Sequence, residues 1–371
     1  MRQPGKSSRR TWIASGIGLV ALGALGAGLA WSGRAPWPIR RVIHLPKPAY
    51  MGFISGDNRW LVTLDRKSSW VYTDLATGQP RQNPPTARTW AADYSRDRRT
   101  LVGVDFRADR SAVLLVDTAS GAIQRRFTTD EKEVYRPMFG DEERSIEALA
   151  GTGTQFTALV TWDLATGTAT RRPFRGPDGL SATKLLLDAS PDRRILVFWD
   201  RQPNQFQLWD VAADRQLGGL IPSPVLLNGG PGMAWTPDSR RLFLARADGR
   251  VEVRDMAAPD SSRTLQVHSP EFRTNWIAIS PDSRTLAADG YVGNPTNWFD
   301  QTWRKLRWKV SADWWYQAMT EVVVIDLASG RQRARFRGAI EPVFSPDGRS
   351  FVTRGWDAVY TVRDAPPPTE P

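Results

Sequence analysis

A short unit of sequence recurs seven times between residue 50 and the C-terminus. In each unit an apolar stretch ends in a turn resembling Ser-Pro-Asp-x-Arg, a second apolar stretch follows, and a third ends at an aspartate. Asp and Ser side chains can form hydrogen bonds with backbone amides just downstream, and Pro restricts φ at the corner. These residues therefore indicate β-turns. The turn aspartates are Asp57, Asp97, Asp141, Asp192, Asp238, Asp282 and Asp347, and the third-strand aspartates are Asp74, Asp117, Asp163, Asp210, Asp255, Asp326 and Asp364.

The spacing of these units predicts the fold. Six of the seven separations between a turn aspartate and its third-strand aspartate lie between 17 and 22 residues. Repeats of about 40–45 residues with four strands are typical of β-propellers. The last unit stops at Asp364 without a fourth strand, whereas an unassigned strand at about 40–45 precedes the first unit. We therefore predict an all-β, seven-bladed β-propeller over residues 40–365, closed by its N-terminal strand so that no sheet edge is left free.

Two dipeptides and one turn resemble known repeat families. Trp162-Asp163 and Trp209-Asp210 match the dipeptide of the WD40 family, and the turn at 345–349 also resembles the repeats of TolB-type propellers. The Gly-His pair that opens many WD40 repeats is missing, so the histidine network of that family is not expected here. We expect His44 and His268 to be strand or loop residues. The resemblance implies the fold and says little about function.

The net charge of +11 is concentrated at the N-terminus. Residues 1–50 hold eight basic residues and no acidic one, which leaves +3 for the rest of the chain. A nucleic-acid-binding domain would carry its charge as a patch on the folded body, so we expect no nucleic-acid partner. Cysteine is absent, which excludes disulfides, thiolate metal sites and a cysteine nucleophile.

The N-terminus has the pattern of a membrane anchor. A basic tail, residues 1–10, precedes an uncharged stretch, residues 11–31, that carries a tryptophan near each end, Trp12 and Trp31. In a helix these two indoles would lie roughly 29 Å apart, close to the thickness of the hydrocarbon core of a bilayer. Tryptophan at both interfaces is usual for such a span. We predict one transmembrane helix, followed by a Pro-containing linker at 32–39.

The basic residues before this span favour a cytoplasmic N-terminus, which would place the propeller on the extracytoplasmic, periplasmic side. Two alternatives remain open. Residues 8–13 resemble a twin-arginine export signal, in which case the segment would be cleaved and the body released. The opposite orientation would give a scaffold that faces the cytoplasm.

No catalytic motif is recognisable in the sequence. There is no phosphate-binding loop, no nucleophile elbow and no histidine cluster. We expect no catalytic, cofactor-binding or metal-binding residues and no cofactor. An enzyme or a small-ligand receptor that uses the central funnel stays an alternative, because funnel sites are built from dispersed residues.

The sixth unit carries an insertion at about 291–320. Its aspartate separation is 44 residues where the commonest is 17. Phe299, Trp303, Leu306 and Val310 fall on one face of a helix, so we predict a short amphipathic helix there. It could pack on its own blade, form a partner-binding lid, or lie at a membrane interface.

The insertion and the loops between blades should open on the same face of the ring. Trp, Tyr and Arg dominate binding hot spots, so we take the aromatic and arginine residues of that face as a candidate partner-binding surface. The sequence thus predicts a membrane-tethered scaffold for protein–protein interaction that ends in a Pro-rich tail, residues 366–371. The candidate residues are Arg88, Trp90, Tyr135, Arg136, Arg273, Trp276, Trp298, Trp308, Trp314 and Trp315.

Overall fold

The structure of the chain is a computed structural model. It describes residues 37–45, 49–65, 70–81, 89–95, 97–105, 111–152, 155–177, 184–200, 204–222, 232–292, 319–355 and 359–365. Residues Trp37–Pro371 form one compact unit. None of the described segments is a helix with the length and hydropathy of a membrane span. The predicted anchor at 11–31 and the predicted helix of the insertion lie outside the described residues.

Seven antiparallel sheets make up the folded body; six are formed by consecutive strands of the chain, and the seventh joins the last three strands to the first. Blade 1 contains β2 (Ala49–Ile54), β3 (Trp60–Asp65) and β4 (Trp70–Asp74); blade 2 contains β5 (Thr89–Tyr94), β6 (Thr100–Asp105), β7 (Val113–Asp117) and β8 (Ile123–Phe127); blade 3 contains β9 (Glu133–Phe139), β10 (Ser145–Thr152), β11 (Gln155–Asp163) and β12 (Ala169–Pro173). Blade 4 contains β13 (Lys184–Ala189), β14 (Ile195–Asp200), β15 (Gln205–Asp210), β16 (Arg215–Gln216) and β17 (Ile221–Pro222).

The remaining three blades follow the same order. Blade 5 contains β18 (Met233–Trp235), β19 (Arg241–Ala245), β20 (Arg250–Asp255) and β21 (Ser262–Gln266); blade 6 contains β22 (Phe272–Ile279), β23 (Thr285–Val292), β24 (Thr320–Asp326) and β25 (Gln332–Arg337). Blade 7 contains β26 (Ile340–Phe344), β27 (Ser350–Arg354) and β28 (Val359–Asp364), and its fourth strand is β1 (Ile39–His44).

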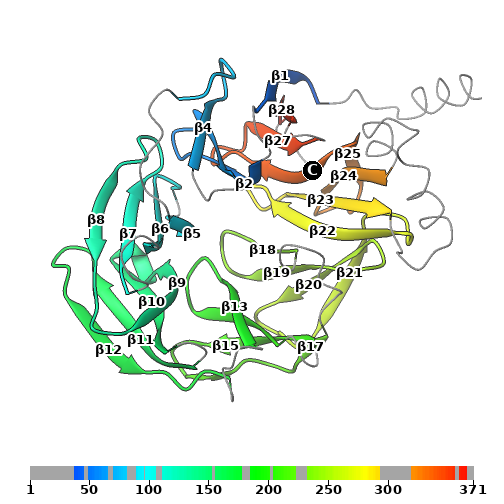
Figure 1. Ribbon diagram of the computed structural model, residues 1–371. Helices are drawn as coiled ribbons and strands as arrows, with labels where there is room; N and C mark the ends of the chain where they lie inside the picture. The colour runs from blue at the N-terminus through cyan, green and yellow to red at the C-terminus, as the bar shows by residue number, and fades with distance from the viewer. Residues whose placement is uncertain are drawn as a thin grey trace, which may run out of the picture. The chain divides into compact units, whose positions relative to one another are not determined.

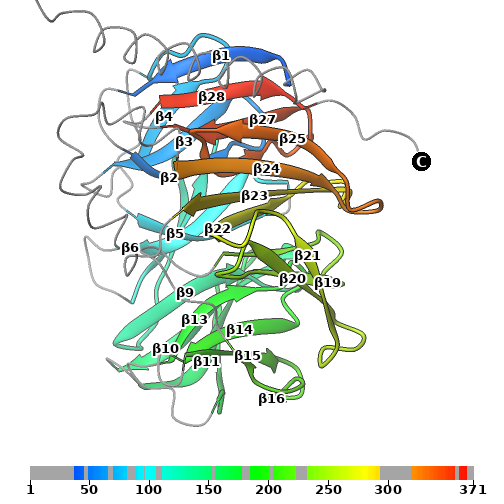
Figure 2. The same cartoon turned by 90° about the vertical axis from the view of Figure 1, so that its right-hand side faces the viewer.

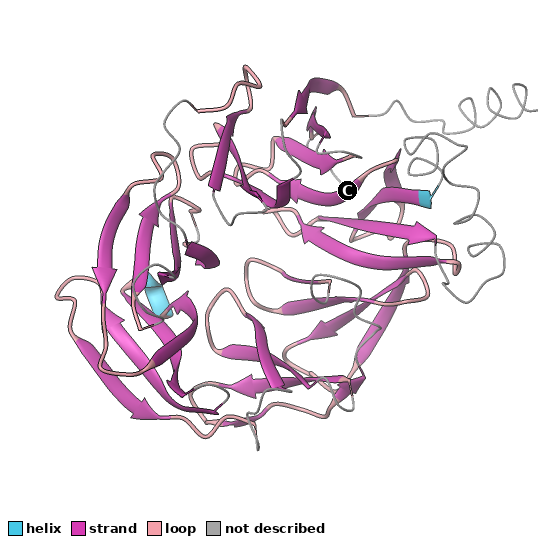
Figure 3. Cartoon of the chain, in the orientation of Figure 1, coloured by secondary structure: helices cyan, strands magenta, loops and turns pink. Residues whose placement is uncertain are grey.

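The first strand of each blade lies innermost, and the blades are arranged around a common centre (Figure 1). Strands account for nearly all the regular structure that is described (Figure 3), and a single 3-10 turn, Asp141–Glu143, replaces the usual corner in blade 3. The prediction of an all-β, seven-bladed propeller is therefore confirmed. Because the strands of a blade are antiparallel, the turns after the first and third strands share one end of the ring, which we call the turn face. We call the opposite end the loop face.

The N-terminal strand closes the ring as predicted. Strand β1 pairs antiparallel with β28, and the two lie together at the outer edge of blade 7 (Figure 2). Ile43 on β1 is 1% exposed and joins a core cluster shared by blades 7 and 1. The folded body begins before the predicted boundary at residue 40, because Trp37 is buried and packs edge-on against Phe351 at 5.1 Å.

The repeated turn residues act as the sequence indicates. In six blades a Ser or Thr hydroxyl donates to the turn aspartate and accepts the backbone N–H five residues on. In blade 6, for example, Ser280 Oγ accepts from the N–H of Thr285 at 2.9 Å. The third-strand aspartates bond backbone amides of the following turn in the same way, as Asp326 does with Ser329. The aspartate carboxylates therefore serve to stabilise the turns.

Arginines in or next to the outer strands link neighbouring blades, which could not be predicted from the repeat pattern. Each donates to a carbonyl oxygen in or next to the turn after the third strand of the next blade. Because these carbonyls belong to turns, they are free to accept. The pairs are Arg41 with Thr77, Arg81 with Ala119, Arg125 with Leu164, and Arg172 with Val211.

The fourth strand of blade 4 is interrupted. It is split into β16 and β17, which both pair with β15, and residues 217–220 bulge out between them. Gly218 adopts φ 69° in this bulge, a conformation that glycine tolerates well. The interruption leaves Leu220 half exposed at the rim of the blade.

Candidate functional site

The predicted surface residues fall into two groups. Arg88, Trp298, Trp308, Trp314 and Trp315 lie outside the described residues, and for Trp90 the structure describes only the backbone, on β5. Tyr135 and Arg136 lie on β9, and Arg273 and Trp276 lie on β22. All four described side chains therefore come from innermost strands. The sequence expected them on loops between blades.

Bulges in the innermost strands explain this placement. Six of the seven innermost strands shift register against their second strand, so each presents extra backbone and side chains near the centre. In β22 the shift falls between Thr274 and Ile277, which makes Trp276 part of the bulge. In β9 it includes Arg136, whose φ of 50° is left-handed and unfavourable for a long side chain.

Trp276 is held rigidly by a buried carboxylate on the neighbouring strand. Asp289 of β23 accepts the N–H of Trp276 at 2.6 Å and the N–H of Glu341 at 3.0 Å. Asp289 is only 3% exposed, and burial raises its pKa to about 6, against the lowering effect of these two N–H groups. One carboxylate thus ties the bulge of blade 6 to the bulge of blade 7.

The insertion in blade 6 emerges beside Arg273. Arg273 is the register partner of Tyr291, and Tyr291 is the register partner of Thr320. Both roots of the insertion therefore lie next to the loop-face end of β22. Arg273, Tyr291 and Val292 at this corner, and Trp276 in the bulge further along β22, are all half-buried, so part of each side chain reaches solvent.

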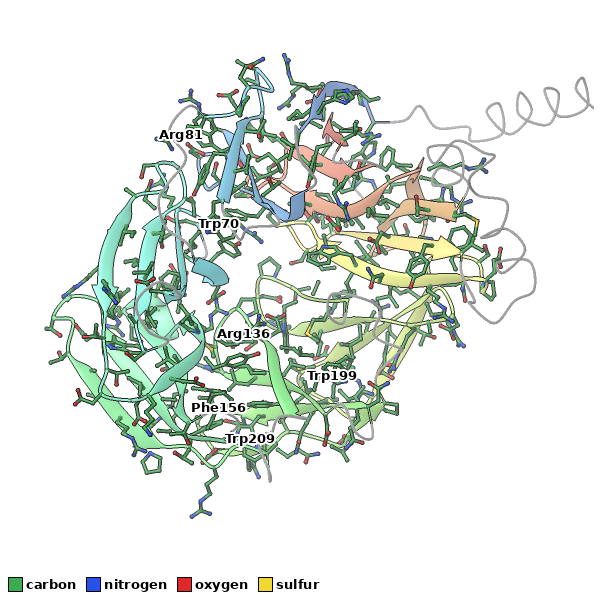
Figure 4. All side chains as sticks on the ribbon, in the orientation of Figure 1. Trp70, Arg81, Arg136, Phe156, Trp199 and Trp209 are labelled. Carbon is green, nitrogen blue, oxygen red and sulfur yellow. The ribbon has the colours of Figure 1, made fainter. Side chains whose placement is uncertain are left out.

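Tyr135 is a packing residue. Its ring stacks on Phe156 at 5.3 Å and 28°, and both rings pack against the core cluster between blades 3 and 4, which includes Trp209. Phe156 and Trp209 are labelled in Figure 4. Arg136 of the same strand lies close enough to Asp188 on β13 to lower the pKa of that carboxyl. Both residues belong to the partner surface predicted from the sequence, and in the structure the partly exposed Tyr135 also packs between blades.

One histidine belongs to a buried pair that the sequence did not indicate. His268 precedes β22, and its Nδ1 lies 3.0 Å from Glu321 Oε1 on β24. The imidazole stacks on Phe272 at 5.6 Å and lies against Gly290, where an added Cβ would come within 2.9 Å of the ring. Glu321 is separated from His268 by 53 residues, so no local spacing could reveal the pair. Its glycine neighbour makes room for the ring.

A second polar cluster lies at the innermost strands of blades 2, 3 and 4. Asp93 on β5 accepts the N–H of Phe139 on β9 at 2.9 Å and pairs with Arg193 at 2.6 Å. Arg193 belongs to the turn that follows β13, and it also donates to the carbonyl oxygen of Tyr94 at 3.4 Å. A turn of blade 4 thus reaches blade 2 across the end of blade 3. The Asp93 and Arg193 side chains are 15% and 11% exposed, so solvent still contacts the pair.

Asp188 completes this cluster. It stands on β13 at the position that Asp93 holds on β5, because both precede the turn serine by two residues. Burial raises the pKa of Asp188 to about 6, while Arg136 and Arg193 lower it and Asp93 raises it. Asp188 therefore interacts electrostatically with three side chains, those of Asp93, Arg136 and Arg193. The four form a continuous electrostatic cluster around the centre of the ring.

The raised pKa of Asp188 predicts a pH dependence of stability. The folded chain holds the proton up to about pH 6, whereas the unfolded chain releases it near pH 4, so this group's contribution is lost as the pH rises from 4 to 6. We expect Asp188→Asn to be more stable relative to the wild type at pH 7 than at pH 4, by roughly 1–3 kcal/mol. Urea titrations at both pH values measure the difference, with exposed Asp130→Asn as the control. A difference that does not change with pH would contradict the prediction.

The sequence contains one signal for this cluster. The residue after each turn aspartate has a positive φ in every blade, and in four blades it is Asn58, Ser239, Ser283 or Gly348. In blades 2 and 4 it is an arginine, Arg98 or Arg193. In blade 3 it is Glu142. A long charged side chain at a position that favours short or flexible residues is a departure from the repeat; it occurs in three turns, and only those of blades 2 and 4 are basic.

Comparison with known proteins bears on the fold. No protein-family model matches the chain, and no curated protein matches it. Among solved structures, the chain is similar to the crystal structure of the Myceliophteria thermophila Cps50 (Swd1) β-propeller domain. The two share 13% identity with a TM-score of 0.58, over 89% of this chain and 100% of that one. The likeness shows the fold alone: this chain is an all-β, WD40-like, seven-bladed β-propeller.

Proposed function

We propose that this protein is a membrane-tethered, extracytoplasmic scaffold whose loop face binds a protein partner at blade 6. Propellers of this fold are typical interaction scaffolds, and their faces gather residues from several blades. The observation that carries the proposal is the convergence at one corner of blade 6. Arg273 lies beside both roots of the insertion there, and Trp276 follows in the bulge of the same strand.

The chemistry of this corner suits a binding hot spot. Trp and Arg are the side chains most enriched at such spots, and Trp276 and Arg273 are half-buried, so part of each can be covered by a partner. The bonds from Asp289 fix the backbone of Trp276 and connect it to blade 7. A rigid anchor loses little conformational entropy on binding, which raises affinity.

The tether and the location rest on the sequence. The uncharged stretch at 11–31, its two flanking tryptophans and the basic tail before it support a single anchor with the propeller outside the cytoplasm. A reporter fused to the C-terminus tests this directly. Activity of a periplasmic reporter supports the proposed orientation, and activity of a cytoplasmic reporter alone refutes it.

Co-purification from gently solubilised membranes tests the docking corner. The full chain is compared with a variant in which Asn-Gly replaces residues 293–318. Tyr291 and Thr320 already pair, so this two-residue turn can close β23 and β24 as a hairpin without moving the blade. We expect a partner that is recovered with the full chain to be lost with the variant, while the thermal midpoint stays unchanged.

Point substitutions separate the surface from the insertion itself. We expect Arg273→Ala and Trp276→Ala to weaken recovery of the partner, because each removes a half-exposed hot-spot side chain. Arg240→Ala is the control, since Arg240 is exposed on the turn face. Recovery that falls with Arg240→Ala, or that is unaffected by both blade-6 substitutions, would place the docking surface elsewhere.

A further inference from the structure

We infer that the turn face carries a binding site for a small anion, a carboxylate or phosphate group, formed by Arg98 and Arg193 at the innermost strands of blades 2 and 4. This site lies at the opposite end of the ring from the docking corner of blade 6. It does not depend on the scaffold proposal. The site would bind a small molecule that approaches along the centre of the ring.

The first support is the departure of both arginines from the repeat. Arg98 and Arg193 follow their turn aspartates and have φ values of 55° and 62°. The left-handed backbone belongs to this turn in every blade, and it is unfavourable for a long side chain, so the long side chain sets these two arginines apart, together with Glu142 of blade 3. The equivalent residues Ser239 and Asn58 are short, and each accepts a backbone N–H from the turn of an adjoining blade. The turn itself therefore has no need for an arginine.

The second support is the convergence of the two guanidinium groups. Arg193 donates to the carbonyl oxygen of Tyr94, and the Arg98 guanidinium lies over the Tyr94 ring at 5.7 Å from its centre. Both therefore gather at one residue of β5, near its turn-face end. The innermost strands β5 and β13 that carry these turns both border the centre of the ring (Figure 1).

The third support is spare hydrogen-bonding capacity. One amino group of Arg193 contacts the Asp93 carboxylate and the carbonyl oxygen of Tyr94, while the buried Nε has no hydrogen-bond partner. For Arg98 the structure gives, among the described residues, a ring contact and no carboxylate in ion-pair range. A guanidinium has five N–H donors, and a buried donor without a partner is costly, so these groups favour an acceptor that carries negative charge.

The charge of the surroundings agrees with a single anionic group. Three guanidiniums, those of Arg98, Arg136 and Arg193, face two carboxylates, Asp93 and Asp188. Asp93 is already engaged by Arg193 and by the N–H of Phe139. One positive charge remains, and it belongs to Arg98. Carboxylate and phosphate oxygens match the fork of donors on a guanidinium, which makes them the ligand chemistry of choice.

The experiment follows thermal unfolding of the purified full chain by tryptophan fluorescence. Inorganic phosphate, acetate and citrate are titrated at constant ionic strength, with chloride as the balancing anion. A ligand that binds the folded state raises the unfolding midpoint in a saturable way. Saturation with phosphate alone assigns a phosphorylated ligand, and saturation with acetate or citrate alone assigns a carboxylate. No saturable rise with any of the three overturns the inference.

Arg98→Ser is the decisive variant, because Ser283 holds the same position in blade 6 with a similar φ of 59°. Arg98 holds no ion pair with a described residue, so its removal leaves no carboxylate stranded. We expect binding at least about tenfold weaker than in the wild type. Arg98→Asn, which copies Asn58 of blade 1, serves if the serine variant does not fold. Arg240→Ser, on the same face and exposed, should bind like the wild type. Equal binding by wild type and Arg98 variants would also overturn the inference.

Discussion

Replacing Ile43 by aspartate should destabilise the propeller by at least about 4 kcal/mol, because it places a charge in the seam that closes the ring. The Ile43 side chain is 1% exposed and packs with residues of blades 7 and 1. Burying an isoleucine contributes roughly 1.5–3 kcal/mol, and the carboxylate adds the cost of losing its hydration. Urea denaturation of the full chain, followed by tryptophan fluorescence, measures the change.

Val42→Asp is the matched control for this prediction. Val42 precedes Ile43 on the same strand, but it points outward and is 46% exposed. Since neighbouring side chains of a strand face opposite sides, the same substitution should change the free energy of unfolding by less than about 1 kcal/mol. Equal loss in the two variants would mean that strand propensity, rather than burial, governs the effect. Little loss in either would mean that β1 does not close the ring in solution.

The second large effect is expected at Glu252, which lies between two arginines at the interface of blades 4 and 5. The side chain is 6% exposed, and its carboxylate pairs with Arg246 and, at 2.7 Å, with Arg254. Burial lowers the pKa of both arginines. Glu252→Ala leaves two guanidiniums buried without their counter-ion, and we expect a loss of about 3–5 kcal/mol.

A double variant tests the cause. Blade 6 holds Val323 and Ile325 at the positions of Glu252 and Arg254, counted back from the third-strand aspartate. We expect Glu252→Val with Arg254→Ile to recover part of the loss, because apolar residues replace one of the two buried ion pairs and only Arg246 keeps an uncompensated charge. Exposed Glu271→Ala should stay within about 0.5 kcal/mol of the wild type. If the double variant is less stable than Glu252→Ala alone, stranded charge is not the cause.

The sequence was sufficient for the architecture because the fold repeats. Six of the seven turns begin with Ser or Thr and continue to Asp, which indicates a local hydrogen-bond pattern, and local patterns can be predicted from neighbouring residues. The missing fourth strand of the last blade and the extra strand before the first blade predicted the closure by β1. Where the turn letters change, at Asp141 in blade 3, the local structure changes with them.

The candidate site was harder to predict. The sequence identified residue types that suit binding, but it could not tell which would face solvent. Tyr135 packs between blades, and Trp276 lies in a bulge that Asp289 stabilises. Bulges depend on the register of two strands and carry little sequence signal.

What the sequence determined by itself was the number of blades, their turns and the closing strand, since each depends on contacts within about forty residues or on a count. What only the tertiary structure decided was which polar side chains meet. Arg193 reaches Asp93 from two blades away, and His268 reaches Glu321 from the loop between blades 5 and 6. Such contacts depend on how the blades pack around the centre. A buried charge without a partner is unfavourable, so it pairs with an opposite charge that is close in space, whatever the distance along the chain.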